Sequence, residues 1–272
     1  MGNLRIAAAR PGSTSRSGGA APARFAPKGQ LQTRVKEASD VVALGAGRFA
    51  VVSDTRAALF VVDSRGRSLK LELEGIKGES ELEGVAYDPV KQRLFVSREE
   101  RGELLRYTWK GGADRPVLEK KLDAGVDGSD NKGIEGLAYL PAGQSPTSQA
   151  QLLGVKEGRP RQLLAFADSG KGEPVEVDLD KELKRRLDDF SALAVDPKTG
   201  HVFIASDESS AVAQVRLVRD GKRLKGVLVQ SLELHDGAGG RLERIEGLTF
   251  DPKGDLFVLT ENDGVLHRLE RR

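Results

Sequence analysis

The sequence predicts an all-β propeller of about five four-stranded blades, with six blades as the alternative, and three observations support this fold class. First, a pattern of apolar strand, turn and apolar strand recurs five times along the 272 residues. Second, the turn is often Asp-Pro followed by glycine. This chemistry favours tight hairpins, because proline presets φ and glycine tolerates positive φ. Third, only residues 180–187 suggest a helix, and we expect a short one between blades.

The five repeats have the spacing of propeller blades. Their first strands carry Ala43, Gly84, Gly136, Ala192 and Gly247, which are separated by 41, 52, 56 and 55 residues. Each hairpin is followed by a third apolar run, and in several repeats by a more polar fourth one. Radial repetition of a four-stranded antiparallel sheet describes a propeller.

The two ends of the chain have different expected roles. The last repeat ends on its third strand, so we expect residues 31–36 to supply the missing strand and to close the ring. Residues 1–28 are rich in Gly, Ala, Ser, Pro and Arg and are expected to form a disordered tail. The propeller domain is then expected to cover residues 29–272.

Composition excludes several functions. The 43 basic and 41 acidic residues give a net charge of +2, without the basic excess of a nucleic-acid-binding protein. The absence of cysteine excludes disulfides, thiolate metal sites and cysteine nucleophiles, and the three histidines show no metal-ligand spacing. No apolar run is long enough for a membrane-spanning segment or a signal-peptide core. We expect a monomer that does not bind nucleic acid.

Acidic residues recur at one edge of the predicted hairpins. The start of the first strand and the end of the second lie at the same edge, because the two strands are antiparallel. Innermost strands line the channel of a propeller, so these side chains are expected to converge at one mouth. The candidates are Glu83, Glu135 and Glu246 on first strands and Glu100, Glu157, Glu208 and Glu261 after second strands.

Carboxylates gathered in this way repel one another unless they are neutralised. Donors that are all oxygen favour a hard cation such as Ca²⁺ over zinc or copper, and small residues beside the glutamates suit a crowded site. Two alternatives remain open: the glutamates only begin their strands, or they form an ion-pair ring with the interleaved basic residues. The basic residues in question are Arg98, Arg101, Lys132, Lys156 and Arg159.

These motifs resemble the bacterial SdiA-regulated family, a propeller group distantly related to NHL-repeat proteins. The most specific segments are residues 133–139 with Lys156-Glu157, residues 206–209, and residues 245–247 with Thr260-Glu261. The resemblance covers about residues 31–269. It implies five blades, a calcium site, no established enzymatic activity, and a place in the periplasm or cell envelope behind an N-terminal anchor, although no anchor is visible in the sequence.

Two functions follow as expectations. The first is a calcium-binding propeller that binds a small ligand or a protein at its channel mouth. The second is a metal-assisted hydrolase of phosphoesters or lactones, because the Glu-Gly-Leu-Ala segment also resembles the esterase-like phytase propellers. No nucleophilic triad is recognisable around the histidines.

Overall fold

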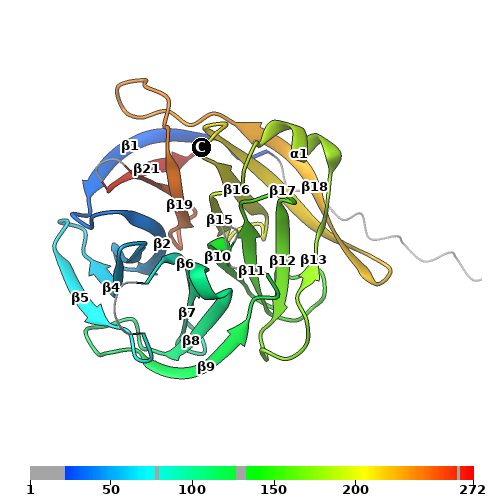
Figure 1. Ribbon diagram of the computed structural model, residues 1–272. Helices are drawn as coiled ribbons and strands as arrows, with labels where there is room; N and C mark the ends of the chain where they lie inside the picture. Colours follow the sequence, from blue (N-terminus) through cyan, green and yellow to red (C-terminus); the bar gives the residue numbers. More distant parts are fainter. Residues whose placement is uncertain (1–21, 77–79, 127–132, 262–263) are drawn as a thin grey trace, which may run out of the picture.

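The computed structural model describes residues 22–76, 80–126, 133–261 and 264–272. These residues form five mainly antiparallel sheets that surround a central axis like the blades of a propeller (Figure 1). The five-bladed prediction is therefore confirmed, and the six-bladed alternative is wrong. No helix in the described part of the chain has the length and apolar character needed to cross a membrane.

In blades 1, 2 and 3 the strands follow the chain from the axis outward. Blade 1 contains β2 (Ala38–Gly45), β3 (Arg48–Ser53), β4 (Arg56–Val62) and β5 (Ser68–Glu72). Blade 2 contains β6 (Leu82–Asp88), β7 (Arg93–Arg98), β8 (Glu103–Thr108) and β9 (Val117–Asp123), with a 3-10 helix, η1 (Glu99–Arg101), after β7. Blade 3 contains β10 (Ile134–Leu140), β11 (Gln151–Lys156), β12 (Gln162–Ala167) and β13 (Val175–Glu176).

Blades 4 and 5 depart from this simple order. Blade 4 contains β15 (Ala192–Val195), β16 (Val202–Ser206), β17 (Ala211–Asp220) and β18 (Arg223–Leu232), and β14 (Asp178–Leu179) adds a parallel fifth strand outside β18. The predicted short helix is α1 (Lys181–Arg186), which Asp180 caps by accepting the backbone N–H of Glu182. Blade 5 contains β19 (Ile245–Phe250), β20 (Leu256–Thr260) and β21 (Val265–Arg271), with β1 (Phe25–Gln32) outside β21.

An N-terminal strand closes the ring, as expected, but its position in the sequence was predicted wrongly. The strand spans Phe25–Gln32 rather than residues 31–36, because Arg34 and Glu37 have positive φ values of 59° and 46° and cannot continue an extended strand. The strand begins inside the expected tail because Phe25 packs 6.0 Å from Phe203, between the ring centroids. Residues 1–21 of the expected tail lie outside the described residues.

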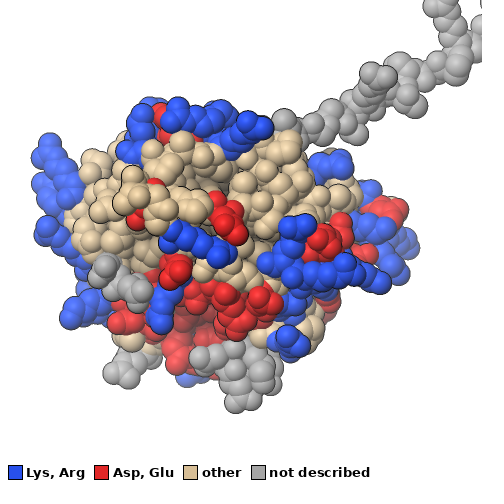
Figure 2. All heavy atoms as spheres, turned by 90° about the horizontal axis from the view of Figure 1, so that it is seen from above, with Lys and Arg blue, Asp and Glu red and all other residues tan. Residues whose placement is uncertain are grey.

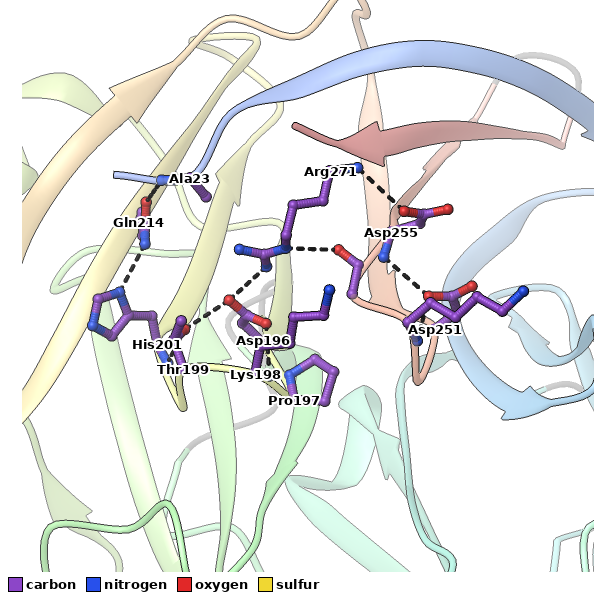
Figure 3. A network of polar contacts seen from close by, with 12 residues as sticks. Ala23, Asp196, Pro197, Lys198, Thr199, His201, Gln214, Asp251, Asp255 and Arg271 are labelled. Atoms are coloured by element: carbon purple, nitrogen blue, oxygen red, sulfur yellow. Dashed lines mark hydrogen bonds and ion pairs between the residues drawn. The ribbon is translucent and has the colours of Figure 1, made fainter. Parts of the chain in front are cut away.

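A polar network reinforces this closure on the face that carries the Asp-Pro turns (Figure 3). The Arg271 guanidinium pairs with the buried Asp196 carboxylate at 2.6 Å, which links blade 5 to the β15–β16 turn of blade 4. The backbone N–H of Ala23 donates to Gln214 Oε1 at 2.9 Å, and the Gln214 amide in turn contacts His201 Nδ1 at 2.7 Å. The N-terminal segment therefore fastens blade 4 as well as blade 5.

Candidate functional site

The innermost strands of three blades each place a glutamate at the same end of the channel. Glu83, Glu135 and Glu246 lie on β6, β10 and β19, one residue after the start of each strand. At each glutamate the pairing with the second strand shifts register, as in a β-bulge. Bulges re-aim side chains at strand ends. Because the same bulge occurs in all three blades, the repeated glutamates leave their strands in equivalent ways.

The residue after each glutamate is a glycine because the blades approach one another closely there. A Cβ on Gly84 would lie 3.0 Å from the backbone nitrogen of Leu137 in the next blade. A Cβ on Gly136 would lie 2.8 Å from the nitrogen of Leu193, so neither position can accept a side chain without movement of the backbone. This confirms that the first-strand glycines stand where the backbones are crowded around the axis.

The three glutamates are half-buried and belong to one electrostatic site. Burial raises the pKa of Glu83 well above its usual value, and the charges of Glu99, Asp54 and Glu246 raise it further. Burial likewise raises the pKa of Glu135, with Glu83 as the largest charge contribution. Acidic side chains gather in one region of the molecular surface (Figure 2). The carboxyl groups from different blades therefore converge, as the sequence predicted.

Glu246 joins the same site from the opposite side of the ring. Burial raises its pKa to about 8, with further contributions from the charges of Asp207, Glu261 and Glu157. A carboxyl group with this pKa is largely protonated at pH 7 unless a positive charge is supplied.

Glu99 was not predicted as a site residue, but it belongs to the acidic site more clearly than its neighbour Glu100 does. Glu99 begins the 3-10 helix η1, is buried, and accepts the backbone N–H of Gly133 at 3.2 Å. Its carboxyl group lies within hydrogen-bonding reach of the Glu135 carboxyl group, and Glu135 Oε1 is buried without a donor. Two carboxyl groups in this arrangement share a proton or require a cation.

The exit residues of the second strands divide into two groups. Glu100 is exposed and pairs with Arg98 at 2.6 Å, and Glu261 pairs with Arg244. For these two residues the ion-pair alternative is the better description. Glu157 is half-buried, and its pKa is raised by burial and by nearby acidic residues.

Blade 4 contributes different acids from those predicted. Glu208 is exposed, whereas Asp207 is half-buried and has a pKa raised by burial and by the charge of Asp189. Asp189 itself is buried and receives the Ser206 hydroxyl and the backbone N–H groups of Asp207 and Glu208. Asp189 precedes its strand, so a comparison limited to strand positions overlooks it.

The remaining basic candidates differ in exposure and in the contacts that the structure describes. Arg101 and Arg159 are exposed, and Lys156 Nζ donates to the backbone oxygen of Gly158 at 3.1 Å. Lys132 lies outside the described residues.

Asp40 is a further residue that the sequence comparison missed. It stands on β2 where the other blades have glycine or alanine, because the strand register aligns Ser39 rather than Val42 with the glutamates. Asp40 is fully buried and accepts the backbone N–H groups of Val41 at 2.7 Å, Val85 at 2.8 Å and Leu137 at 3.4 Å. Its carboxylate therefore links the innermost strands of blades 1, 2 and 3. A lone acid preceding the apolar run of β2 was the available signal.

We call Glu83, Glu135 and Glu246, with Glu99 and Glu157 beside them, the acidic mouth. Its oxygen donors suit a hard cation, but they are not arranged as a coordination site. Glu135 Oε1 is buried without a partner, and in the described residues Glu83, Glu135 and Glu246 form no ion pair. Within the same residues no three acidic or histidine side chains are already placed to hold a metal ion. The glutamates thus fit a cation by type and charge, and binding would require their side chains to move closer together.

The fold and the site together define a five-bladed β-propeller with an acidic axial mouth. The model of the SdiA-regulated family matches residues 115–265, more than half of the chain, and the chain belongs to this family. The resemblance noted in the sequence is therefore confirmed.

Solved structures show the same fold at low sequence identity. The PQQ-bound aldose sugar dehydrogenase of Streptomyces coelicolor superposes with a TM-score of 0.57 and 14% identity, covering 93% of this chain and 99% of that chain. A putative oxidoreductase (glucose dehydrogenase) of Thermus thermophilus gives a TM-score of 0.52 at 14% identity, covering 92% and 100%. A Bacteroides thetaiotaomicron protein of unknown function gives 0.55 at 10%, covering 85% and 58%. At these identities the likeness concerns the fold alone.

Proposed function

We propose that this propeller is a binding module of the bacterial envelope whose acidic mouth takes a divalent cation such as Ca²⁺. The cation would contribute to a surface that receives a small ligand or a protein. The assignment to the envelope rests on the family resemblance, and the binding chemistry rests on the mouth itself.

One observation carries the proposal. Glu83, Glu135 and Glu246 come from three blades, raise one another's pKa directly or through shared neighbours, and have no ion-pair partner in the described residues. Burial of like charges without a counter-ion is unfavourable, so the site is either protonated or occupied by a cation. A bound Ca²⁺ would supply the charge that allows these carboxyl groups to ionise together.

The residues of this chain would have distinct parts in such a site. Glu83, Glu135 and Glu246 would hold the cation from three blades, with Glu99 and Glu157 beside them. Because their strands are fixed by the ring, binding requires movement of side chains rather than of blades. Ionisation of the glutamates on binding would release protons, so cation affinity is expected to increase with pH.

Calorimetry tests the proposal. Protein stripped with a chelator is titrated with CaCl₂ in the calorimeter, and its melting temperature is recorded with and without the ion. We expect a saturable heat and a higher melting temperature, because a ligand that binds the folded state stabilises it. The triple variant Glu83→Gln, Glu135→Gln and Glu246→Gln should lose both effects.

A matched triple variant provides the control. Glu72→Gln, Glu173→Gln and Glu233→Gln remove the same formal charge at exposed positions away from the innermost strands and should leave Ca²⁺ binding unchanged. Absence of both heat and stabilisation in the unmodified protein would overturn the proposal. Equal loss in the two triple variants would also overturn it, because the effect would then come from net charge alone.

A further inference from the structure

Asp40 lies along the innermost strands between the acidic mouth and the face of the Asp-Pro turns. The Asp40 side chain is fully buried, and its carboxylate is held by N–H groups of three innermost strands. The glutamates of the acidic mouth precede this level along β6, β10 and β19. On the other side, toward the Asp-Pro turns, a cavity of about 310 Å³ begins at the level of Val85 and Leu137. We call this cavity the turn-face funnel.

The walls of the turn-face funnel are mainly apolar and come from all five innermost strands. They include Ala43, Ala138, Val195, Leu248 and Phe250. The repeat places small or apolar side chains at equivalent positions of successive blades, so the wall is continuous around the axis. A concave apolar pocket at the centre of a ring is a favoured place for a small ligand.

Tyr87 and Thr249, two polar side chains of the wall, already have hydrogen-bond partners within the protein. Tyr87 Oη donates to the backbone oxygen of Trp109 at 3.3 Å. Thr249 Oγ1 accepts the backbone N–H of Ala43 at 2.9 Å, and the Tyr139 hydroxyl group lies near the Asp88 carboxylate, where burial and the Asp88 charge raise its pKa. A ligand in the funnel therefore gains little from charged or strongly polar groups.

The rim has the same character as the walls. Pro89, Pro197 and Pro252 of three Asp-Pro turns border the opening. Val90, next to Pro89, is 88% exposed, although isolated exposed apolar residues are common on protein surfaces. The charged wall residue Asp251 uses Oδ1 to accept the backbone N–H groups of its own turn.

We propose that the turn-face funnel binds a small uncharged apolar or aromatic molecule. Entry of such a molecule removes apolar surface from water on both sides of the contact, and it leaves the hydrogen bonds of the wall intact. None of the residues that line the funnel belongs to the acidic mouth, so the ligand enters and leaves on the turn face. This site is separate from the acidic mouth and does not depend on the cation.

Fluorescence with a neutral apolar probe tests the inference. N-phenyl-1-naphthylamine emits strongly only in apolar surroundings, and titration of the folded protein should give saturable one-to-one binding. Val195→Asp places a carboxylate on the half-buried wall and should weaken binding about tenfold or more. Val61→Asp makes the same change at a half-buried valine that does not line the funnel and should leave probe affinity unchanged.

A second funnel variant separates blocking from misfolding. Val195→Trp fills the space without adding charge, and it should also reduce binding while circular dichroism shows an intact fold. Lack of saturable probe binding by the unmodified protein would refute the inference. So would an equal loss in Val61→Asp, or unchanged affinity in both Val195 variants. The triple glutamate variant should bind the probe normally, and this distinguishes the funnel from the acidic mouth.

Discussion

The Asp40 carboxylate accepts the backbone N–H of Val85 at 2.8 Å and joins the innermost strands of blades 1 and 2 at the axis. An N–H on the inner edge of a blade has no further strand to receive it. The other blades have glycine or alanine at the position equivalent to Asp40. In blade 1 the Asp40 carboxylate instead provides an acceptor that three N–H groups share.

Removal of this acceptor should destabilise the ring. Asp40→Ala leaves the N–H groups of Val85 and Leu137 buried without a partner, and each such group costs about 1–3 kcal/mol. Asp40→Asn keeps one oxygen acceptor and should cost less. Urea denaturation followed by tryptophan fluorescence measures both free energies of unfolding. Asp178→Ala, at an exposed position on β14, should have little effect, and equal stability of Asp40→Ala and the unmodified protein would contradict the assigned role.

The stability of the cation-free protein should decrease as pH rises through the range set by Glu246. Its pKa is raised from 4.5 to about 8 on folding, so the folded state binds the proton more tightly than the unfolded state. The resulting stability is fully present below pH 4.5 and is lost as pH rises to about 8. Each pH unit in this window should remove up to about 1.4 kcal/mol for this one group.

Thermal unfolding of chelator-treated protein between pH 5 and pH 8 measures this dependence. Glu246→Gln should flatten the slope, because glutamine does not titrate. Glu173→Gln, at an exposed position, should keep the slope of the unmodified protein. A slope that is the same in all three proteins would show that Glu246 titrates normally.

Gly136 should not tolerate even a methyl group. In Gly136→Ala the new Cβ would meet the backbone of Ala192 and Leu193 at 2.8–3.1 Å, where only a shift of blade 3 against blade 4 relieves the contact. We expect a loss of about 1–3 kcal/mol in the free energy of unfolding. Gly112→Ala is the control, because no atom lies within 4 Å of its new Cβ. Similar melting temperatures for the two variants would exclude close packing of the blades at Gly136.

Arg271 should contribute more to stability than its neighbour Arg272. Arg271→Ala leaves the buried Asp196 carboxylate without its cation and removes a guanidinium that lies 5.4 Å from the Phe25 ring centroid. The expected cost is about 3 kcal/mol. Arg272→Ala removes only an exposed side chain, 3.8 Å from Glu270, and should change stability by less than about 1 kcal/mol. Differential scanning calorimetry compares them, and indistinguishable unfolding temperatures would count against the network in Figure 3.

The fold was predictable because repetition and turn chemistry are both local properties of the sequence. The positions of Glu83, Glu135 and Glu246 followed from them, since antiparallel hairpins place strand starts and ends at one edge. Residues next to strand ends were less predictable. Glu99 and Glu100 differ by one position, and only the 3-10 turn after β7 decides which of them faces the site.

The remaining errors of the prediction concern the exact positions of two strands, β2 and β1. Asp40 was missed because a shift of a few residues in the comparison of β2 with the other first strands assigned Val42 to the glutamate position. The closing strand was misplaced because Arg34 and Glu37 adopt positive φ without being glycine or asparagine. The positive φ values leave no pattern in the sequence that period or composition detects, and for Asp40 the lone acid before the apolar run of β2 was the only signal.

Blade 5 combines the first strand of the described chain, β1, with the last three, β19, β20 and β21. During synthesis, therefore, four blades can assemble as the polypeptide emerges, while β1 waits without a partner until β21 leaves the ribosome. Pairing of β1 with β21 then completes blade 5 and joins the two ends of the described chain. Truncation of β21 would expose the edge of β20 and leave β1 without a partner, a species prone to pair with other chains.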